Sequence, residues 1–370
     1  MEVLDFMNMH KNWEEMLTQP PYNIIVRRDG EYILLKYNQL GSDFSIPIVR
    51  ECRGAIFWQN EDGKYECVCR AFDKFGNYGE SYVPEIDWEH VTVEEKVDGS
   101  LIKVWYHNGM WHVSTNGSID AYKCDVNDLD VTFGSLFNEA VRCDNLDDFF
   151  ATLDRYSTYM FELVSPQSRV TIFYPETKLY YLGQRRMLYC MEEFKEYDPL
   201  WAKKFGILYP KTYNLNSLED CLGHVNAMTK DEEGFVIKDW ESNRMKLKSP
   251  EYLLAFHLNN NGAITTKRIV RMIKNNMIDD FMAYCSAYRD KAQKVVDKIN
   301  SIADTLEHDW QHVRNVAEDG DRKEFARVAA KYMSKDYLFA KYDDPHMNAF
   351  DWVASRFTAK IMRMLKEYDV

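Results

Sequence analysis

The sequence predicts an α+β protein of two domains, in which antiparallel sheets dominate the first domain and helices form the second. Three observations support this prediction. Residues 1–258 alternate short β-rich runs with Asx-Gly turn signals, a pattern typical of β-hairpins. Beyond residue 263, apolar residues recur every three or four positions, which is the period of an amphipathic helix. The polar segment 259–262, Asn-Asn-Asn-Gly, separates the two patterns.

The first domain is expected to contain several β-hairpins. The pairs Asp29-Gly30, Asp62-Gly63 and Asn108-Gly109 each stand between two β-rich runs, and Asx-Gly is preferred in two-residue hairpin turns. Further strands are predicted at residues 159–164, 169–174, 178–188, 234–238 and 244–248. Helical patterns intervene near residues 133–153, 198–205 and 217–229, and Ser217 with Asp220 resembles a capping box.

The second domain, residues 263–370, is expected to be all-helical. Apolar residues in steps of three and four run from residue 278 to residue 313 and trace one face of a long helix. A second stripe runs from Met347 to Met364. Because such helices are stabilised by burying their apolar faces against each other, we interpret the stripes as core, with a partner-binding seam as the alternative.

The charge balance bears on the class of function. The chain of 370 residues has 46 basic and 59 acidic residues, a formal net charge of −13 and a pI near 5.3. This balance excludes a protein coated with positive charge that binds nucleic acid without specificity. It leaves room for a local basic groove, because residues 235–275 hold eight basic and only three acidic residues.

The cysteines and the apolar runs bear on location. None of the eight cysteines forms a Cys-x-x-Cys pair, which favours free thiols in a reducing cytoplasm over disulfides. The N-terminus shows no signal-peptide pattern, and no apolar run approaches the ~20 residues that span a bilayer. We therefore expect a cytoplasmic protein that has no membrane partner. The sequence does not indicate its protein partners or its oligomeric state.

One short motif points to chemistry. Residues 96–100 read Lys-Val-Asp-Gly-Ser and lie between two strand-like runs, which would hold the lysine at a sheet edge. Taken alone, the motif is an ordinary turn that follows a surface lysine. Its weight comes from an ordered set of further motifs: Tyr37-Asn38, Glu51–Gly54, Phe72–Asn77, Phe161–Pro166 with Arg169, Glu233–Val236, and Lys246–Lys248 followed by Ser249 and Tyr252.

With these motifs the sequence resembles the covalent nucleotidyltransferases, and most closely the phage RNA ligase 1 family. The matches follow the order and approximate spacing of the family over residues 30–255. The resemblance implies an antiparallel-sheet adenylyltransferase domain at residues 1–258. The helical residues 263–370 also fit this family, whereas DNA ligases and capping enzymes place a small β-barrel after the last lysine motif.

The resemblance implies an ATP-dependent RNA ligase that works in three steps. Lys96 attacks the α-phosphate of ATP and forms a lysyl–AMP adduct. The AMP moves to the 5′-phosphate of an RNA end, and a 3′-hydroxyl end then displaces it and seals the strand. The helical domain would bias the enzyme toward broken tRNA-like loops, which implies a role in RNA repair and tRNA processing. A viral protein that acts in the cytoplasm of its host would fit this family.

The site residues make chemical sense for that reaction. Nucleotide-binding roles fall on Tyr37, Arg53, Lys74, Lys96, Asp98, Gly99, Glu162, Lys246 and Lys248. Neighbouring cations activate a lysine nucleophile, hold phosphates and offset charge in the transition state. Asp98 would fix the loop or the ribose, Gly99 permits close backbone approach, Glu162 suits the ribose hydroxyls, and Tyr37 would line the nucleotide pocket. Glu233 is a hard ligand for Mg²⁺ or Mn²⁺, and Asp279 corresponds by position to a second metal-contacting carboxylate.

Two departures and two alternatives accompany this interpretation. Gly76 stands where the family has an aromatic residue, and Asn116 stands where it has a lysine that would contact phosphate. Lys103 or Lys123 could replace that lysine. One alternative function is another lysine nucleotidyltransferase, such as a DNA ligase or a GTP-using capping enzyme. The other is a non-catalytic RNA-binding protein on the same fold, which would be expected to have lost one of the key site residues.

Overall fold

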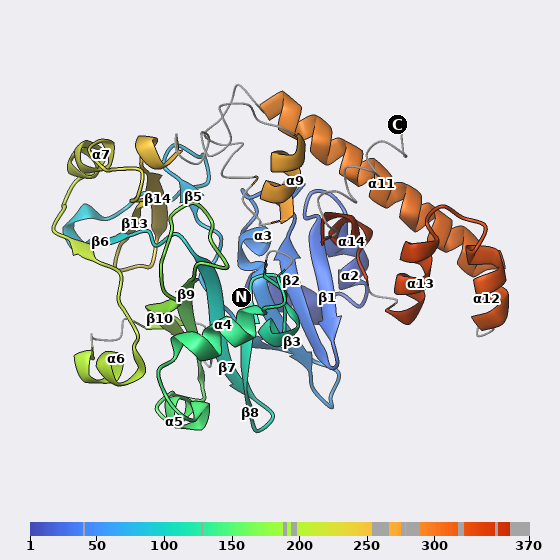
Figure 1. Ribbon diagram of the computed structural model, residues 1–370, viewed down its shortest axis with the longest axis horizontal. Helices are drawn as coiled ribbons and strands as arrows, with labels where there is room; N and C mark the ends of the chain where they lie inside the picture. The colour runs from blue at the N-terminus through green and yellow to red at the C-terminus, as the bar shows by residue number, and fades with distance from the viewer. Residues whose placement is uncertain are drawn as a thin grey trace. The chain divides into compact units, whose positions relative to one another are not determined.

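The computed structural model describes residues 1–39, 41–126, 129–187, 191–193, 198–253, 266–274, 278, 289–316, 322–344 and 347–355. The chain separates into two compact units, Met1–Gly262 and Ala263–Val370 (Figure 1). The polar segment 259–262, which the sequence suggests as a domain boundary, lies outside the described residues.

The described residues of the first unit form three sheets, and all the strand pairs in these sheets but one are antiparallel. The first sheet has the order β1 (Ile24–Asp29), β2 (Tyr32–Tyr37), β3 (Arg53–Gln59), β4 (Tyr65–Cys69). The second has the order β11 (Met191–Glu193), β10 (Lys178–Arg186), β9 (Ser157–Val164), β7 (Ser100–His107), β8 (Met110–Thr115). The third has the order β12 (Thr212–Tyr213), β6 (Thr92–Glu95), β13 (Gly234–Lys238), β14 (Arg244–Lys248), β5 (Gly76–Asn77), and only β5 pairs with its neighbour in parallel. This architecture confirms the α+β prediction.

The predicted hairpins form where the Asx-Gly pairs stand. Asp29 ends β1 and pairs with Tyr32, so Gly30 and Glu31 join β1 to β2, and Asp62 with Gly63 lies between β3 and β4. The turn between β7 and β8 has Asn108 at φ 47° and Gly109 at φ 81°. Two successive positive φ angles are those of a type I′ turn, whose twist matches the flanking strands.

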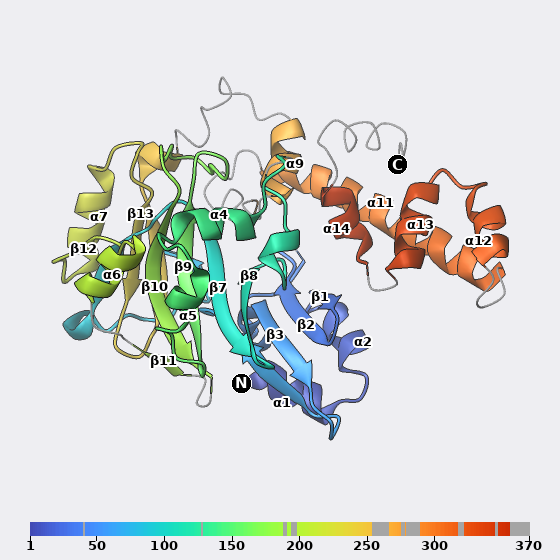
Figure 2. The same cartoon turned by 60° about the horizontal axis from the view of Figure 1, so that its bottom comes forward.

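Helices cover the sheets of the first unit. α1 (Glu2–Met9), α2 (Trp13–Thr18) and α3 (Pro47–Glu51) pack on the first sheet, while α7 (Leu218–Asn226) packs on the third. α4 (Phe133–Ala140), α5 (Leu146–Phe150) and α6 (Pro199–Phe205) lie against the second sheet (Figures 1 and 2). The single-turn 3-10 helices η1 (Trp88–His90) and η2 (Ala121–Lys123) complete the unit.

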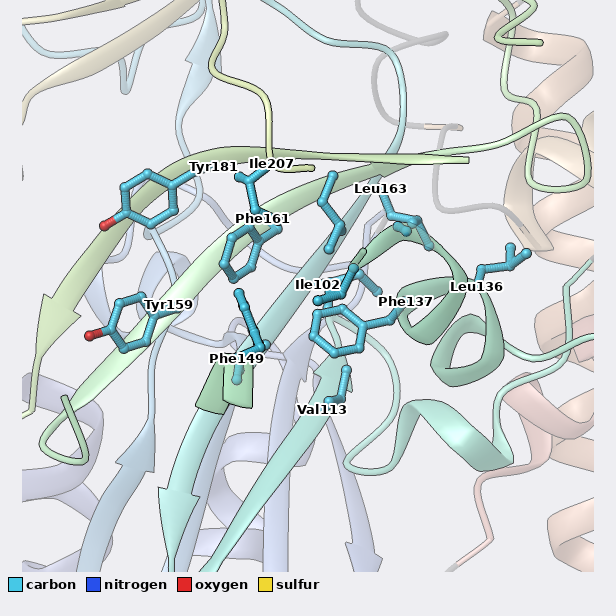
Figure 3. Close-up of a cluster of buried hydrophobic side chains, with 14 of the residues drawn as sticks. Ile102, Val113, Leu136, Phe137, Phe149, Tyr159, Phe161, Leu163, Tyr181 and Ile207 are labelled. Carbon is cyan, nitrogen blue, oxygen red and sulfur yellow. The ribbon is translucent and has the colours of Figure 1, made fainter. Parts of the chain in front are cut away.

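The core of the second sheet is rich in aromatic residues. Phe137 of α4, Phe149 of α5 and Phe161 of β9 are each completely buried and point toward one another (Figure 3). Ile102 of β7 and Leu163 of β9 join the same cluster. This packing fixes β7 and β9, the two strands that begin or end beside the motif at residues 96–100.

Three sequence expectations differ from the structure. The pattern at residues 133–153 divides into α4 and α5, because Val141 is extended and the side chain of Asn145 caps a new helix by accepting from Asp147 N–H. Residues 169–174 form no strand, and backbone amides from this segment bind a carboxylate instead. The short helices α1 and α2 were not predicted from the sequence.

The described part of the second unit is helical. It contains α9 (Thr266–Lys274), α11 (Arg289–Val316), α12 (Arg322–Ala329), α13 (Lys335–Asp343) and α14 (Ala349–Ser355). The predicted stripe on α11 is buried at every position from Ala292 to Val313, namely at residues 292, 295, 299, 302, 306, 310 and 313. α12, α13 and α14 pack against α11, which supports the interpretation of the stripe as core. Among the described residues, no helix combines the length and the apolar character needed to cross a membrane.

Candidate active site

The predicted nucleophile lies where the chain passes from one sheet to another. Lys96 follows β6 of the third sheet, and β7 of the second sheet begins four residues later at Ser100. The backbone N–H of Lys96 donates to the carbonyl oxygen of Gly234 at 2.8 Å, which continues the pairing of β6 with β13. The backbone at Lys96 is therefore fixed, while its side chain remains 21 % exposed.

A buried carboxylate joins two lysines of the site. Glu233, at the start of β13, is 3 % exposed at its side chain. Its Oε2 lies 2.9 Å from Nζ of Lys96, and its Oε1 lies 3.0 Å from Nζ of Lys248. Lys248 is also buried, and its strand β14 pairs with β13 so that Lys248 faces Gly234. The structure thus brings together three residues that the sequence separates by up to 152 positions.

Asp98 fixes the loop that carries the nucleophile. Its Oδ2 accepts the backbone N–H groups of Thr171 and Ile172 at 2.8 Å and 2.6 Å, and its Oδ1 accepts the hydroxyl of Tyr252 at 2.9 Å. The hydroxyl of Tyr174 accepts the backbone N–H of Asp98 at 3.3 Å. Burial, together with the nearby charge of Glu233, raises the pKa of Asp98 to about 6. No local sequence pattern singles out Tyr174, because its contact depends on a fold that brings it to residue 98.

Gly99 lies close against Glu162 and Leu163 of β9. A Cβ added to Gly99 would lie 2.4 Å from the carbonyl oxygen of Leu163 and 3.0 Å from Cγ of Glu162. A side chain at position 99 would therefore collide with the backbone of β9, as the expectation of close approach requires. Burial raises the pKa of Glu162 to about 7, although the positive charges of Lys96 and Arg53 act in the opposite direction.

Aromatic rings surround the remaining cations of the site. Nζ of Lys74 lies 5.4 Å from the ring centre of Tyr37 and 4.9 Å from that of Phe44. The ring of Phe75 lies 5.4 Å from the guanidinium carbon of Arg53 and 5.9 Å from Nζ of Lys246. Lys74 and Lys246 are 8 % and 7 % exposed. Strand β5 links the segment of Lys74 to the strand that carries Lys246, because Asn77 of β5 pairs with Lys246 of β14.

Gly76, the first departure from the family pattern, has a structural reason. A Cβ at Gly76 would lie 2.6 Å from Cγ2 of Val83 and 2.9 Å from both Glu80 Oε2 and the ring of Tyr82. The side chains of residues 80–83 therefore occupy the space that an aromatic residue would need at position 76.

The structure gives no support to either suggested replacement for the lysine missing at Asn116. Lys103 is completely buried, and its ammonium donates to the carbonyl oxygen of Gly54. The ammonium of Lys123 lies 2.7 Å from a carboxylate oxygen of Asp29. Desolvation lowers the pKa of Lys103, with the charge of Arg53 acting in the same direction. Both lysines are thus engaged elsewhere.

The predicted metal ligands are only partly described. Asp279 lies outside the described residues, which contain no group of three or more His, Cys, Asp or Glu side chains placed to hold a metal ion. Mg²⁺ commonly binds through one or two carboxylates and completes its shell with water and substrate phosphates. Glu233 fits that mode, with one of its lysine partners displaced.

Comparisons with known proteins find both sequence relatives and similar solved structures. A family model described as RNA ligase matches residues 51–252. A protein of Autographa californica nuclear polyhedrosis virus, named as a bifunctional polynucleotide kinase/RNA ligase, is 32 % identical over 291 residues, which cover 74 % of this chain and 40 % of that protein. An RNA ligase of Rhodothermus phage RM378 is 25 % identical over 387 residues, covering 86 % of this chain and 87 % of the relative. A solved archaeal ATP-dependent RNA ligase aligns with a TM-score of 0.47 and 12 % identity, over 92 % of this chain and 81 % of that one. This chain thus spans less than half the length of the baculovirus relative.

Proposed function

Because the chain belongs to the phage RNA ligase 1 family, we propose that it is an ATP-dependent RNA ligase that joins 5′-phosphate and 3′-hydroxyl RNA ends. The single observation that carries the proposal is the lysine pair at one buried carboxylate. Lys96 and Lys248 lie 2.9 Å and 3.0 Å from the two oxygens of Glu233. The plain alternative, a surface lysine before a turn, does not account for a carboxylate buried between two ammonium groups, because burying a charge is costly unless it is paired.

The proposed chemistry begins at the Lys96 amine. The nitrogen, having lost a proton to solvent, attacks the α-phosphorus of ATP. A nitrogen–phosphorus bond forms while the bond to the β-phosphate breaks, the nitrogen gives a second proton to solvent, and pyrophosphate leaves. An oxygen of the RNA 5′-phosphate then attacks the AMP phosphorus, the nitrogen–phosphorus bond breaks, and the lysine nitrogen takes up a proton as it leaves. Finally the 3′-hydroxyl oxygen attacks the RNA 5′-phosphorus, loses its proton, and AMP leaves with the bonding electrons.

Four cations are proposed to hold the phosphates. Arg53, Lys74, Lys246 and Lys248 come from three different segments, and the three lysines are at most 8 % exposed. Charges shielded from water act more strongly on a phosphate than charges in solvent. The ring of Tyr37, beside Lys74, is proposed to line the base pocket. A divalent cation held by Glu233 would neutralise triphosphate charge.

Asp98 and Glu162 have different proposed tasks. Asp98 anchors the nucleophile loop through three accepted hydrogen bonds, so its task is to position that loop. Glu162 adjoins Gly99 and is proposed to bind the ribose hydroxyls. A pKa near 7 lets Glu162 accept or donate a hydrogen bond at neutral pH.

The wider biology is also a proposal. We assign adenylyl transfer to residues 1–258 and a bias toward cleaved tRNA-like loops to residues 263–370. Five described cysteines, at 52, 69, 124, 143 and 221, are free thiols, which supports a reducing cytoplasm as the site of action. Both named relatives are viral, which supports a role in the cytoplasm of an infected host.

Covalent labelling tests the function. The protein is incubated with Mg²⁺ and ATP labelled at the α-phosphate, and the label that stays on the denatured protein is measured. Wild-type protein and Lys123→Ala should be labelled, whereas Lys96→Ala should not. Lys123 is a suitable control because it is an exposed lysine paired with Asp29. Absence of label with every nucleotide would instead identify a non-catalytic RNA-binding protein.

Two further arms separate the remaining alternatives. Label from GTP but not from ATP would identify a capping-type enzyme. Sealing of a nicked RNA hairpin, without sealing of the same hairpin in DNA, would identify an RNA ligase. The reverse preference would contradict the proposal and identify a DNA ligase.

A further inference from the structure

A buried arginine outside the proposed set of phosphate ligands joins two of the site's segments. Arg70 is 6 % exposed and lies just after β4. Its guanidinium binds Asp73 through three contacts of 2.8 Å to 3.0 Å and binds Oε1 of Glu51 at 3.2 Å. Its backbone N–H donates to Thr158 Oγ1 of β9 at 3.3 Å. The side chain of Arg70 thus links residues 51 and 73, while its backbone is held to the second sheet.

Each acidic partner adjoins a proposed phosphate ligand. Glu51 precedes Arg53 by two residues, and Asp73 is immediately followed by Lys74. Backbone contacts join the same two segments, since Lys74 N–H donates to the carbonyl oxygen of Arg50 at 2.9 Å. The guanidinium of Arg53 reaches back to the carbonyl oxygen of Phe72 at 3.4 Å. These contacts and the ion pairs of Arg70 with Glu51 and Asp73 together hold the segments of Arg53 and Lys74 side by side.

The chemistry of arginine suits this task. A planar guanidinium can bind Asp73 with two nitrogens and still direct a nitrogen to Glu51, whereas an ammonium is a single point charge. Glu51 is 11 % exposed and also accepts the backbone N–H of Val3 at 2.8 Å. Burial raises the pKa of Glu51, and the charge of Arg70 acts in the opposite direction. Arg70 thus stabilises the carboxylate whose segment carries Arg53.

We propose that Arg70 is a positioning residue, which sets the distance between Arg53 and Lys74 and so shapes the binding site for the ATP triphosphate. This inference rests on the proposed function, because it takes Arg53 and Lys74 as phosphate ligands. Loss of the Arg70 guanidinium should impair lysyl–AMP formation, because that step uses a triphosphate. It should spare the final sealing step, because an already adenylylated RNA end carries no triphosphate.

The test uses a double variant that removes the guanidinium without leaving a buried charge. Arg70→Met with Glu51→Gln keeps an amide oxygen to accept the N–H of Val3, and Asp73 is 39 % exposed and can be solvated. We measure kcat/KM for lysyl–AMP formation, sealing of a pre-adenylylated nicked RNA, and the melting temperature. The expected result is a 10- to 100-fold loss of kcat/KM for ATP, of the order that a displacement of about 1 Å causes, with sealing changed less than about three-fold. The kcat/KM for ATP of Arg70→Lys should lie between that of the wild type and that of the double variant.

A matched control removes an ion pair far along the chain. Lys341 lies 2.5 Å from Glu307 in the helical unit and is 11 % exposed. Lys341→Met with Glu307→Gln should lower the melting temperature while leaving kcat/KM for ATP unchanged. Equal losses of the ATP step and the sealing step in the Arg70 double variant would overturn the positioning role. If the wild type forms lysyl–AMP and the Arg70 double variant has an unchanged kcat/KM for ATP, the positioning role is overturned as well. If the wild type itself forms no lysyl–AMP, the proposed function is overturned.

Discussion

Gly99 offers a sharp test of how closely the nucleophile loop must fit against β9. In Gly99→Ala, the new Cβ would lie 2.4 Å from the carbonyl oxygen of Leu163, whereas ordinary contact begins at 3.4 Å. The obstacle is backbone in a central strand, so the loop at residues 96–99 must move by about 1 Å. A displacement of that size costs roughly 100-fold in rate when it moves a reacting group. Overpacking adds a loss of about 1–3 kcal/mol in the free energy of unfolding.

Single-turnover formation of lysyl–AMP at saturating ATP measures the first effect, and urea unfolding measures the second. Gly223→Ala is the control, because Gly223 lies in α7 with nothing within 4 Å of an added Cβ. That change should leave adenylylation unaltered and stabilise the helix by about 0.5–1 kcal/mol. If Gly99→Ala forms lysyl–AMP within about three-fold of the wild-type rate, the close fit between the loop and β9 is not what positions Lys96.

Three further changes probe the surroundings of the site. Tyr252→Phe removes the 2.9 Å hydrogen bond to Asp98 and should cost about 1–3 kcal/mol in urea unfolding; an unchanged midpoint would contradict this. The pKa of Glu162 is about 7 in the folded protein and 4.5 in an exposed chain. Because the folded state binds this proton more tightly than the unfolded state, the free energy of unfolding should fall as pH rises from about 4.5 to 7. Glu162→Gln should remove up to about 3 kcal/mol of that fall between pH 5 and pH 8, and parallel stability curves for the two proteins would refute the assignment. Phe137→Ala opens a cavity in the cluster of Figure 3 and should cost about 3–5 kcal/mol; a loss below 1 kcal/mol would contradict its tight packing.

Local patterns explain which parts of the fold were predictable. Strands β13 and β14 lie at the predicted residues 234–238 and 244–248, because β14 alternates cations with the buried Met245 and Leu247. The buried face of α11 could be predicted for the same reason, because its apolar residues recur every three or four positions over a long stretch. The Asx-Gly hairpins needed only local turn geometry.

The contacts that complete the site have no local signal. The backbone amides of Thr171 and Ile172 bind Asp98 across more than 70 residues, so the segment at 169–174, rich in β-branched and aromatic residues, was mistaken for a strand. Strand β5 has only two residues, and its pairing with β14 depends on the rest of the sheet. Motif order placed the site residues on the right segments, but only the fold brings Glu233 between Lys96 and Lys248.

The parallel pairing of β5 with β14 has a consequence for how the protein becomes active. Residue 77 meets residue 246, so this pairing closes a loop of about 170 residues, and contacts of such long range form slowly because chain entropy opposes them. Lys74 and Lys246 share a site only after that closure. A chain still emerging from the ribosome, or a fragment that ends before β14, would hold Lys96 and Lys74 but lack Lys246 and Lys248. Lysyl–AMP formation would then report the completion of folding, and its lag after dilution from urea would time the closure of this sheet.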